Sequence, residues 1–186
     1  MQFMTKRALE SFLFRVTALC LGLDPEAGEV QSRIRISWPT DPNASSSNPG
    51  WTRDENVVFL RIAKGIDPYA HPENTVYAEN DAGEYVERVT STVCHSITWI
   101  FYGPDATEDA ALVRAALLRD VIRELFHERS MYVVQRINDP MRFDEVYGGQ
   151  WWHRCDLTAQ FYEGVVREFP ATCIEQAPTI SIKEGE

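Results

Sequence analysis

The stretch Tyr85-Val-Glu-Arg-Val-Thr-Ser-Thr-Val-Cys-His-Ser-Ile-Thr-Trp-Ile-Phe-Tyr102 decides the fold class, because apolar and polar side chains alternate along its length. One side carries Val89, Val93, Ile97, Trp99 and Phe101, and the other carries Arg88, Thr90, Thr92, Ser96 and Thr98. This period of two predicts a β-strand with one buried face. Strands in ordinary domains run about 5–6 residues, so this one is either very long or bent. We expect such a strand to project beyond its sheet and pair with a neighbour.

The residues after this strand predict a turn and then a helix. Gly103-Pro104 interrupts the alternation, and Asp105 suits the N-cap position of a helix. An apolar stripe at helical spacing continues to about Glu128 through Ala106, Ala110, Val113, Leu117, Val121 and Leu125. Alternating segments predict further strands at 131–137, 150–163 and 165–169.

The residues before the long strand predict one helix, two strands and two long loops. A helix from about Thr5 to Leu21 is indicated by the apolar stripe of Leu9, Phe12, Leu13, Val16, Leu19 and Cys20. Strands are expected at 31–37 and 57–63. Trp38–Asp54 and Gly65–Gly83 lack periodicity and are rich in turn-forming residues, so both are predicted to be long loops.

This order of elements predicts an α+β fold. A single mixed or mostly antiparallel β-sheet is expected, flanked by two main helices and connected by long loops. The predicted domain covers residues 1–170, and residues 171–186 are expected to form a C-terminal arm.

The charge balance bears on the class of partner. The formal net charge of -10 comes from 28 acidic and 18 basic residues. General affinity for nucleic acid depends on Lys and Arg neutralising phosphates, so this balance excludes a nonspecific nucleic-acid binder. Either the charge serves solubility, or it forms a surface that repels DNA sliding past it.

Neither a signal peptide nor a membrane span is indicated. Glu10 and Arg15 interrupt the apolar residues near the N-terminus, and no clean cleavage site follows them. No run reaches the roughly 18 apolar residues of a membrane helix. We expect a soluble protein that is made in the cytoplasm and has no membrane partner.

Motifs for catalysis or cofactor binding are not found in the sequence. The four cysteines lack CxxC spacing and are expected to be reduced, which leaves open a disulfide between neighbouring subunits. The four histidines lack metal-binding spacing, and phosphate-binding glycine loops are absent. Only Glu84, Glu87 and Asp156, on predicted strands, are candidate metal ligands for a nuclease. We therefore predict no enzyme and no cofactor, with a small metal-dependent nuclease as the less favoured alternative.

Three short motifs, taken in order, resemble the neck or tail terminator proteins of tailed phages. They are Trp38-Pro39, Tyr102-Gly103-Pro104-Asp105-Ala106 and Trp151-Trp152-His153-Arg154-Cys155-Asp156-Leu157. The order and rough spacing of these motifs are similar to those of the terminator proteins over about residues 5–165. The resemblance implies a terminator-like α/β subunit and a structural role in the virion.

The resemblance also implies how the subunit works. Such proteins form closed rings, usually hexamers, that end growth of the tail tube and join it to head-side connector or stopper proteins. Tube or sheath proteins are the partners on the tail side, and DNA passes through the lumen without specific binding. The alternatives are a stopper or completion protein, a tail-tube subunit, or an adaptor with no phage role.

Interface residues are expected among exposed aromatic and charged side chains, because protein interfaces are enriched in aromatic residues. Trp151 and Trp152 point to opposite faces of a strand, so one ring is expected in the core and the other at the surface. The predicted interface residues are Trp38, Trp51, Trp152, Arg154 and Asp156. Asp81 and Glu84 are predicted to line the lumen, with an outward-facing turn on the outer rim as the alternative.

Overall fold

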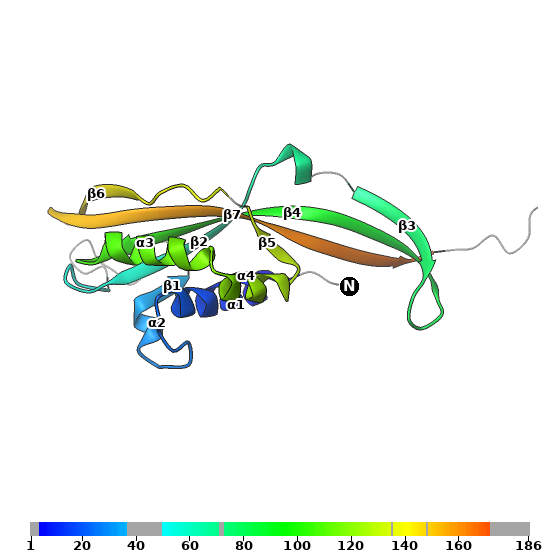
Figure 1. Cartoon of the computed structure of the whole chain (residues 1–186), viewed down its shortest axis with the longest axis horizontal. Coiled ribbons are helices and arrows are strands. Elements are labelled where there is room, and N and C mark those ends of the chain that lie inside the picture. Colours follow the sequence, from blue (N-terminus) through cyan, green and yellow to red (C-terminus); the bar gives the residue numbers. More distant parts are fainter. Residues whose placement is uncertain (1–3, 37–49, 71–72, 135, 148, 172–186) are drawn as a thin grey trace, which may run out of the picture.

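Two long, paired strands lie at the centre of the sheet (Figure 1). The computed structural model describes residues 4–36, 50–70, 73–134, 136–147 and 149–171 of the 186-residue chain. β4 (Tyr85–Tyr102) and β7 (Gln150–Pro170) pair antiparallel from Val86↔Pro170 to Tyr102↔Arg154 without a break in register. The predicted strand over 85–102 is confirmed, and of the two alternatives left open for it the structure has one continuous strand of 18 residues.

The other strands attach to this pair and complete a seven-stranded sheet. β2 (Val57–Lys64) and β3 (Glu73–Glu79) both pair antiparallel with β4, at its end and its beginning respectively. β1 (Ile34–Ile36) runs parallel to β2, whereas β5 (Met131–Val133) and β6 (Met141–Tyr147) pair antiparallel with β7. A single mixed, mostly antiparallel sheet with helices confirms the predicted α+β class.

The helices cover one face of the sheet and leave the end that carries β3 bare (Figure 1). They are α1 (Lys6–Cys20), α2 (Val30–Arg33), α3 (Ala106–Leu117) and α4 (Asp120–His127), and a short 3₁₀ helix, η1, spans Pro68–Ala70. Thr5 caps α1 by accepting a hydrogen bond from the Ala8 amide at 3.2 Å. Among the described residues, no helix is both long enough and apolar enough to span a membrane.

Each face of the β4–β7 pair carries a core. The larger core lies under α1, α3 and α4 and contains the fully buried Trp99 and Phe161. The Trp99 indole nitrogen satisfies its hydrogen bond by donating to the Thr17 hydroxyl at 2.9 Å. A smaller cluster lies on the opposite face and comprises Trp51, Val57, Phe59, Ile100, Tyr102 and Trp152.

A buried polar contact ties the beginning of α1 to the sheet. Glu163 accepts hydrogen bonds from the Met4 amide and from His95, each at 2.7 Å. Burying a carboxylate is costly unless its oxygens are paired. The contact therefore stabilises the position of the N-terminal helix across β4 and β7.

The predicted helix over 106–128 is interrupted, and this changes which side chains it buries. Arg119 adopts an extended conformation and separates α3 from α4. The break shifts the phase of the apolar stripe, so Ile122 and Phe126 are buried while Val121 is 69% exposed. Leu19 on α1 is likewise exposed, contrary to the predicted stripe.

Several predicted loops and strands have different bounds in the structure. The segment 31–37 begins as helix α2, and the strand predicted at 131–137 is only β5. The region predicted as a loop at 65–83 contains η1 and β3, and β6 was not predicted at all. The predicted boundary between the domain and the C-terminal arm at residue 170 stays a prediction, because residues 172–186 lie outside the described part of the chain.

Replacement of Gly103 tests how tightly the turn after β4 is packed. Gly103 has a φ of +113°, and a Cβ there would lie 2.5 Å from the Glu55 carbonyl oxygen. We expect Gly103→Ala to lower the free energy of unfolding by at least about 2 kcal/mol, measured by urea denaturation. Gly83→Ala is the control, because Gly83 also has a positive φ but has open space around it. An equal loss of unfolding free energy in the two variants would contradict the importance of the close contact between Gly103 and Glu55.

Candidate functional site: the two ends of the sheet

The sheet extends past the helices at one end (Figure 1). We call this region the sheet extension: β3, the β3–β4 turn, Tyr85–Ser91 of β4 and Val165–Pro170 of β7. Glu73 of β3 and Val165 of β7 both pair with Ser91 of β4. Ser91 therefore marks the inner limit of the sheet extension on all three strands. No helix of the described chain covers either face of this region in Figure 1.

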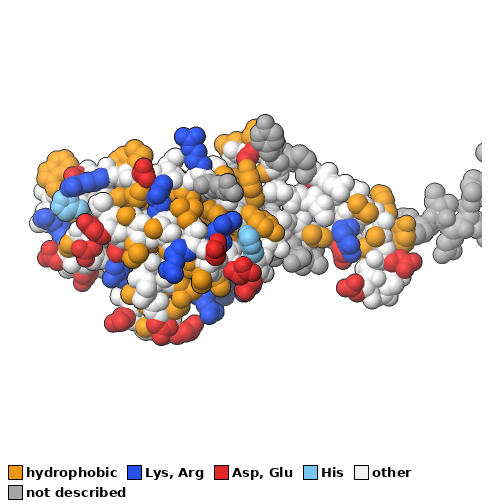
Figure 2. Space-filling model, in the orientation of Figure 1, with side chains coloured by type: hydrophobic (Ala, Val, Ile, Leu, Met, Phe, Trp, Pro, Cys, Tyr) orange, Lys and Arg blue, Asp and Glu red, His pale blue; other side chains and the backbone are white. Residues whose placement is uncertain are grey.

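Apolar side chains lie exposed on the sheet extension (Figure 2). Tyr77 and Phe169 are 58% and 45% exposed, and Val76 and Tyr85 are also exposed. Tyr77 and Phe169 both pair with Glu87, so the three side chains form one row across the strands. Clustered exposed apolar groups of this kind mark contact surfaces in soluble proteins.

The charge on the sheet extension is predominantly acidic. Its acidic side chains are Glu73, Glu79, Asp81, Glu84, Glu87 and Glu168, and its basic side chains are Arg88 and Arg167. Arg88 and Glu168 neutralise each other across β4 and β7 at 2.7 Å. The remaining charges give this region a net negative balance.

Asn80 holds the turn that carries Asp81 and Glu84. Its side-chain oxygen accepts hydrogen bonds from the Ala82 amide at 3.0 Å and the Glu84 amide at 2.8 Å. Asp81 and Glu84 are both exposed at the end of the sheet extension. The fold thus presents two carboxylates on an ordered turn, and a position in a lumen stays a prediction.

The opposite end of the sheet also exposes apolar groups. We call this end the tip, formed by β6 and Gln150–Asp156 of β7. Its exposed apolar side chains are Met141, Phe143, Val146 and Trp151. Figure 2 also shows hydrophobic side chains at this end of the molecule.

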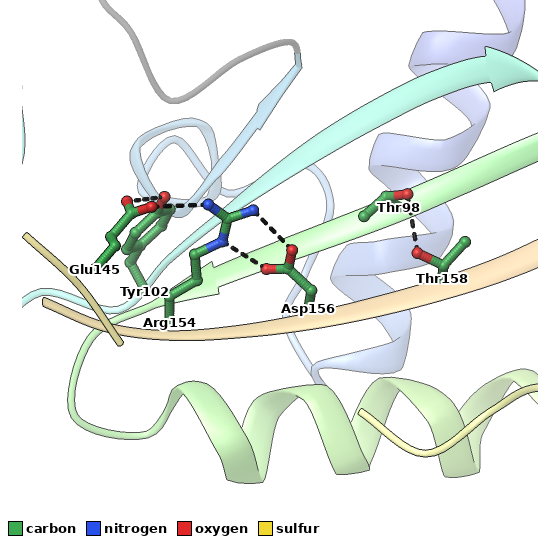
Figure 3. Close-up of polar contacts among 6 residues, drawn as sticks. All are labelled: Thr98, Tyr102, Glu145, Arg154, Asp156 and Thr158. Atoms are coloured by element: carbon green, nitrogen blue, oxygen red, sulfur yellow. Dashed lines mark hydrogen bonds and ion pairs between the residues drawn. The ribbon is translucent and has the colours of Figure 1, made fainter. Parts of the chain in front are cut away.

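A polar cluster connects β4, β6 and β7 at the tip (Figure 3). Arg154 donates two hydrogen bonds to Asp156, both at 2.7 Å, and a third to Glu145 at 2.8 Å. The Tyr102 hydroxyl donates to the other Glu145 oxygen at 2.6 Å. The cluster therefore holds β6 against the end of the long strand pair.

Both carboxylates of the cluster, Glu145 and Asp156, form an ion pair with Arg154. The hydrogen bonds with Asp156 are the largest cause that raises the pKa of Arg154, and burial raises the pKa of the Tyr102 hydroxyl. The Arg154 and Asp156 side chains are only 23% and 18% exposed. Their ion pair is therefore largely shielded from solvent within the subunit.

The three candidate nuclease ligands are not brought together. Glu84 and Glu87 belong to the sheet extension, whereas Asp156 is paired with Arg154 at the tip. Within the described ranges, no group of three or more His, Cys, Asp or Glu side chains is arranged to hold a metal ion.

The structure reverses the roles expected for the two adjacent tryptophans. Trp152 is 8% exposed and its ring centroid lies 5.7 Å from that of Trp51, whereas Trp151 is 65% exposed. The prediction that one ring is buried and one exposed is confirmed, but Trp152 as the exposed ring is wrong. Trp152 faces the smaller core together with Tyr102, and Trp51 covers that face.

The remaining predicted interface residues have mixed outcomes. Trp51 is buried with Trp152 inside the subunit, and Trp38 lies outside the described residues. An intersubunit role for Arg154 and Asp156 stays a prediction. The cluster's partners Tyr102 and Glu145 were missed, although the alternation of Met141-Arg-Phe-Asp-Glu-Val-Tyr147 was a weak signal for β6.

The described cysteines are structural side chains of the core. Cys20, Cys94 and Cys155 are buried and free, and burial raises the pKa of the Cys20 thiol to about 12. Thiolates are the reactive form of cysteine, so this burial disfavours chemistry at Cys20. Cys173 lies outside the described residues.

A comparison with protein-family models found a match for this chain. A family model described as phage neck terminator protein matches residues 7–186, which is nearly the whole chain. No curated protein matches the sequence significantly. The matched range includes the sheet extension, the tip and all the described helices.

Loss of the Arg154 side chain tests whether the tip cluster stabilises the fold. Arg154→Met keeps an unbranched stem but removes the guanidinium, which leaves Asp156 and Glu145 without a cationic partner. We expect the free energy of unfolding to fall by about 2 kcal/mol, because hydrogen bonds to charged groups contribute this much. Arg142→Met is the matched control: Arg142 binds Asp144 at an exposed site on the same strands, where ion pairs contribute little. A loss in Arg142→Met as large as in Arg154→Met would contradict the role assigned to burial.

Proposed function

The chain belongs to the phage neck terminator protein family, a family of structural virion proteins, and we propose that its copies form a closed hexameric ring in the neck. The ring ends growth of the tail tube and joins the tube to the head-side connector. DNA passes through its lumen.

The exposed sheet extension is the observation that carries this proposal. It presents Tyr77, Tyr85 and Phe169 at its surface, and an isolated subunit gains nothing from leaving such side chains in water. Contact with neighbouring copies buries them. A head-to-tail contact of this kind closes into a ring when its rotation permits.

The tip is a second contact surface, separate from the first. Met141, Phe143, Val146 and Trp151 lie at the far end of the long axis from the sheet extension. The polar cluster of Arg154 holds these strands in place. We assign this end to contacts with tube or connector proteins, since it remains accessible when the sheet extensions meet.

The acidic sheet extension suits a channel for DNA. Duplex DNA carries one charge per roughly 1.7 Å of helix axis, so a basic lining would hold it. A lining that includes Asp81 and Glu84 repels the phosphates and lets the duplex slide. The alternative is that this turn lies on the outer rim, where its charges serve solubility.

The ring contact is tested by the double variant Tyr77→Ser, Phe169→Ser. Both side chains are exposed, so the free energy of unfolding should change by less than about 1 kcal/mol. Incorporation of the protein into virions should fall at least tenfold. The measurement is immunodetection of the protein in purified particles.

Tyr132→Ser serves as the control, because Tyr132 is exposed on β5, outside the sheet extension. Normal incorporation of the double variant would contradict the contact. A neck reconstruction that shows a single copy would contradict the ring itself. An open helical stack would favour a tail-tube subunit instead.

The channel assignment is tested by charge reversal in Asp81→Lys, Glu84→Lys. If the turn lines the lumen, DNA ejection from intact particles should slow at least severalfold and recover at high salt, because salt screens the attraction. Ejection is followed by fluorescence of a DNA-binding dye. Asp120→Lys is the control, since Asp120 is exposed on α4. An unchanged ejection rate in particles that contain the double variant would place the turn outside the lumen.

A further inference from the structure

The sheet extension has two open edges. β3 pairs with β4 along one side only, and Val165–Pro170 of β7 pairs with β4 along one side only. On the outer side of β7, pairing with β5 ends at Glu163, followed by one hydrogen bond from the Gly164 amide to Ser130. Within the described ranges, no strand pairs with either outer edge.

The two open edges match in direction and in level. β3 and β7 are both antiparallel to β4, so they run parallel to each other. Glu73 and Val165 both lie opposite Ser91, and Thr75 and Arg167 both lie opposite Val89. The edges are therefore of nearly equal length and begin at the same level of the sheet.

Backbone hydrogen bonds define which groups point outward from β7. The Ala171 amide donates to the Tyr85 carbonyl at 3.2 Å, so odd-numbered residues here face β4. Neighbouring residues alternate in an antiparallel pair. The residues whose backbone groups face outward are Val166, Glu168 and Pro170, the last of which has no N–H.

A backbone hydrogen bond also shows which groups of β3 point outward. The Asn80 amide donates to the Glu84 carbonyl at 2.9 Å, so even-numbered residues face β4. The residues whose backbone groups face outward are Glu73, Thr75, Tyr77 and Glu79. Residues at the same level on β3 and β7 also share a face, because both pair with the same β4 residue.

We propose that the outer edge of β3 in one copy pairs in parallel with the outer edge of β7 in the next copy. The sheet extensions then form one continuous sheet around the ring. This inference rests on the proposed ring and specifies its contact. Rotation about an axis along the strands keeps every strand direction, so it brings β3 and β7 together in parallel. A two-fold axis would instead pair β7 with β7.

In this pairing, the side chains of β3 and β7 complement each other in aromatic contacts and in charge. Tyr77 of one copy lies beside Phe169 of the next on the same face, and neighbouring aromatic side chains stabilise sheets. β3 contributes Glu73 and Glu79 and no basic residue. Arg167 makes no ion pair within the described part of the chain, and the incoming Glu73 is its diagonal neighbour.

Two other arrangements account for open edges. Acidic residues and proline on an edge strand protect a single subunit from unwanted pairing, which fits Glu73, Glu79 and Pro170. The sequence that follows β7 includes the alternating Thr179-Ile-Ser-Ile182, so residues 172–186 are the other candidate to be tested as occupant of its outer edge. The experiment below separates these arrangements from pairing between copies.

Cysteine crosslinking in virions tests the proposed pairing. Thr75→Cys and Arg167→Cys are combined with Cys173→Ser, because the three described native cysteines are buried. Residues at the same level on paired strands have Cα atoms within the range that a disulfide bridges. After mild oxidation, a non-reducing gel of the double-cysteine protein should show a ladder from dimers up to the full ring. Each single-cysteine variant yields at most dimers, and Thr75→Cys with Glu128→Cys, off the sheet extension, should give no ladder.

Three results would overturn the inference. The first is that the double-cysteine protein is incorporated in rings but gives no ladder, as edge protection predicts. The second is efficient dimer formation by Arg167→Cys alone, which indicates two-fold pairing of β7. The third is a ladder that forms only when the chain ends at Ala171, which indicates that residues 172–186 occupy the edge. Absence of rings from the neck would refute the proposed function itself, and this contact with it.

Discussion

The antiparallel pairing of β4 with β7 is the constraint on which the rest of the structure depends. Every residue from Val86 to Tyr102 has a partner on β7, and the register has no bulge. A shift of one residue would exchange the two faces along the whole pair. Both cores depend on this register, because Trp99 and Phe161 face the helices while Tyr102 and Trp152 face the smaller cluster.

The length of this pair also explains why the subunit has two exposed ends. The helices pack on one face of the sheet, and the strands of the sheet extension run beyond them (Figure 1). At the tip, the Arg154 cluster joins three strands on the face opposite α3, and Met141, Phe143, Val146 and Trp151 remain exposed. At the other end, Arg88 and Glu168 join β4 and β7, and the apolar side chains remain exposed. These exposed side chains are the ones that the proposed ring contact would bury.

Three of the described carboxylates hold parts of the fold together. Glu163 anchors the beginning of α1, and Glu145 and Asp156 bind Arg154. A carboxylate held by a cation and by hydrogen bonds stabilises the fold and has little capacity left for a metal ion.

Local patterns in the sequence determined the elements with strong periodicity, and tertiary contacts decided the rest. The alternation of 85–102 and the helical stripe of α1 were sufficient, because burial of one face imposes a clear period on each. β3 and β6 were missed, since both are short edge strands with largely exposed side chains and little contrast between their faces. The period of two placed Trp151 and Trp152 on opposite faces, but only packing against Trp51 determined that Trp152 is buried. A sequence period defines the faces of a strand, whereas the length over which each face is covered depends on segments distant in the chain.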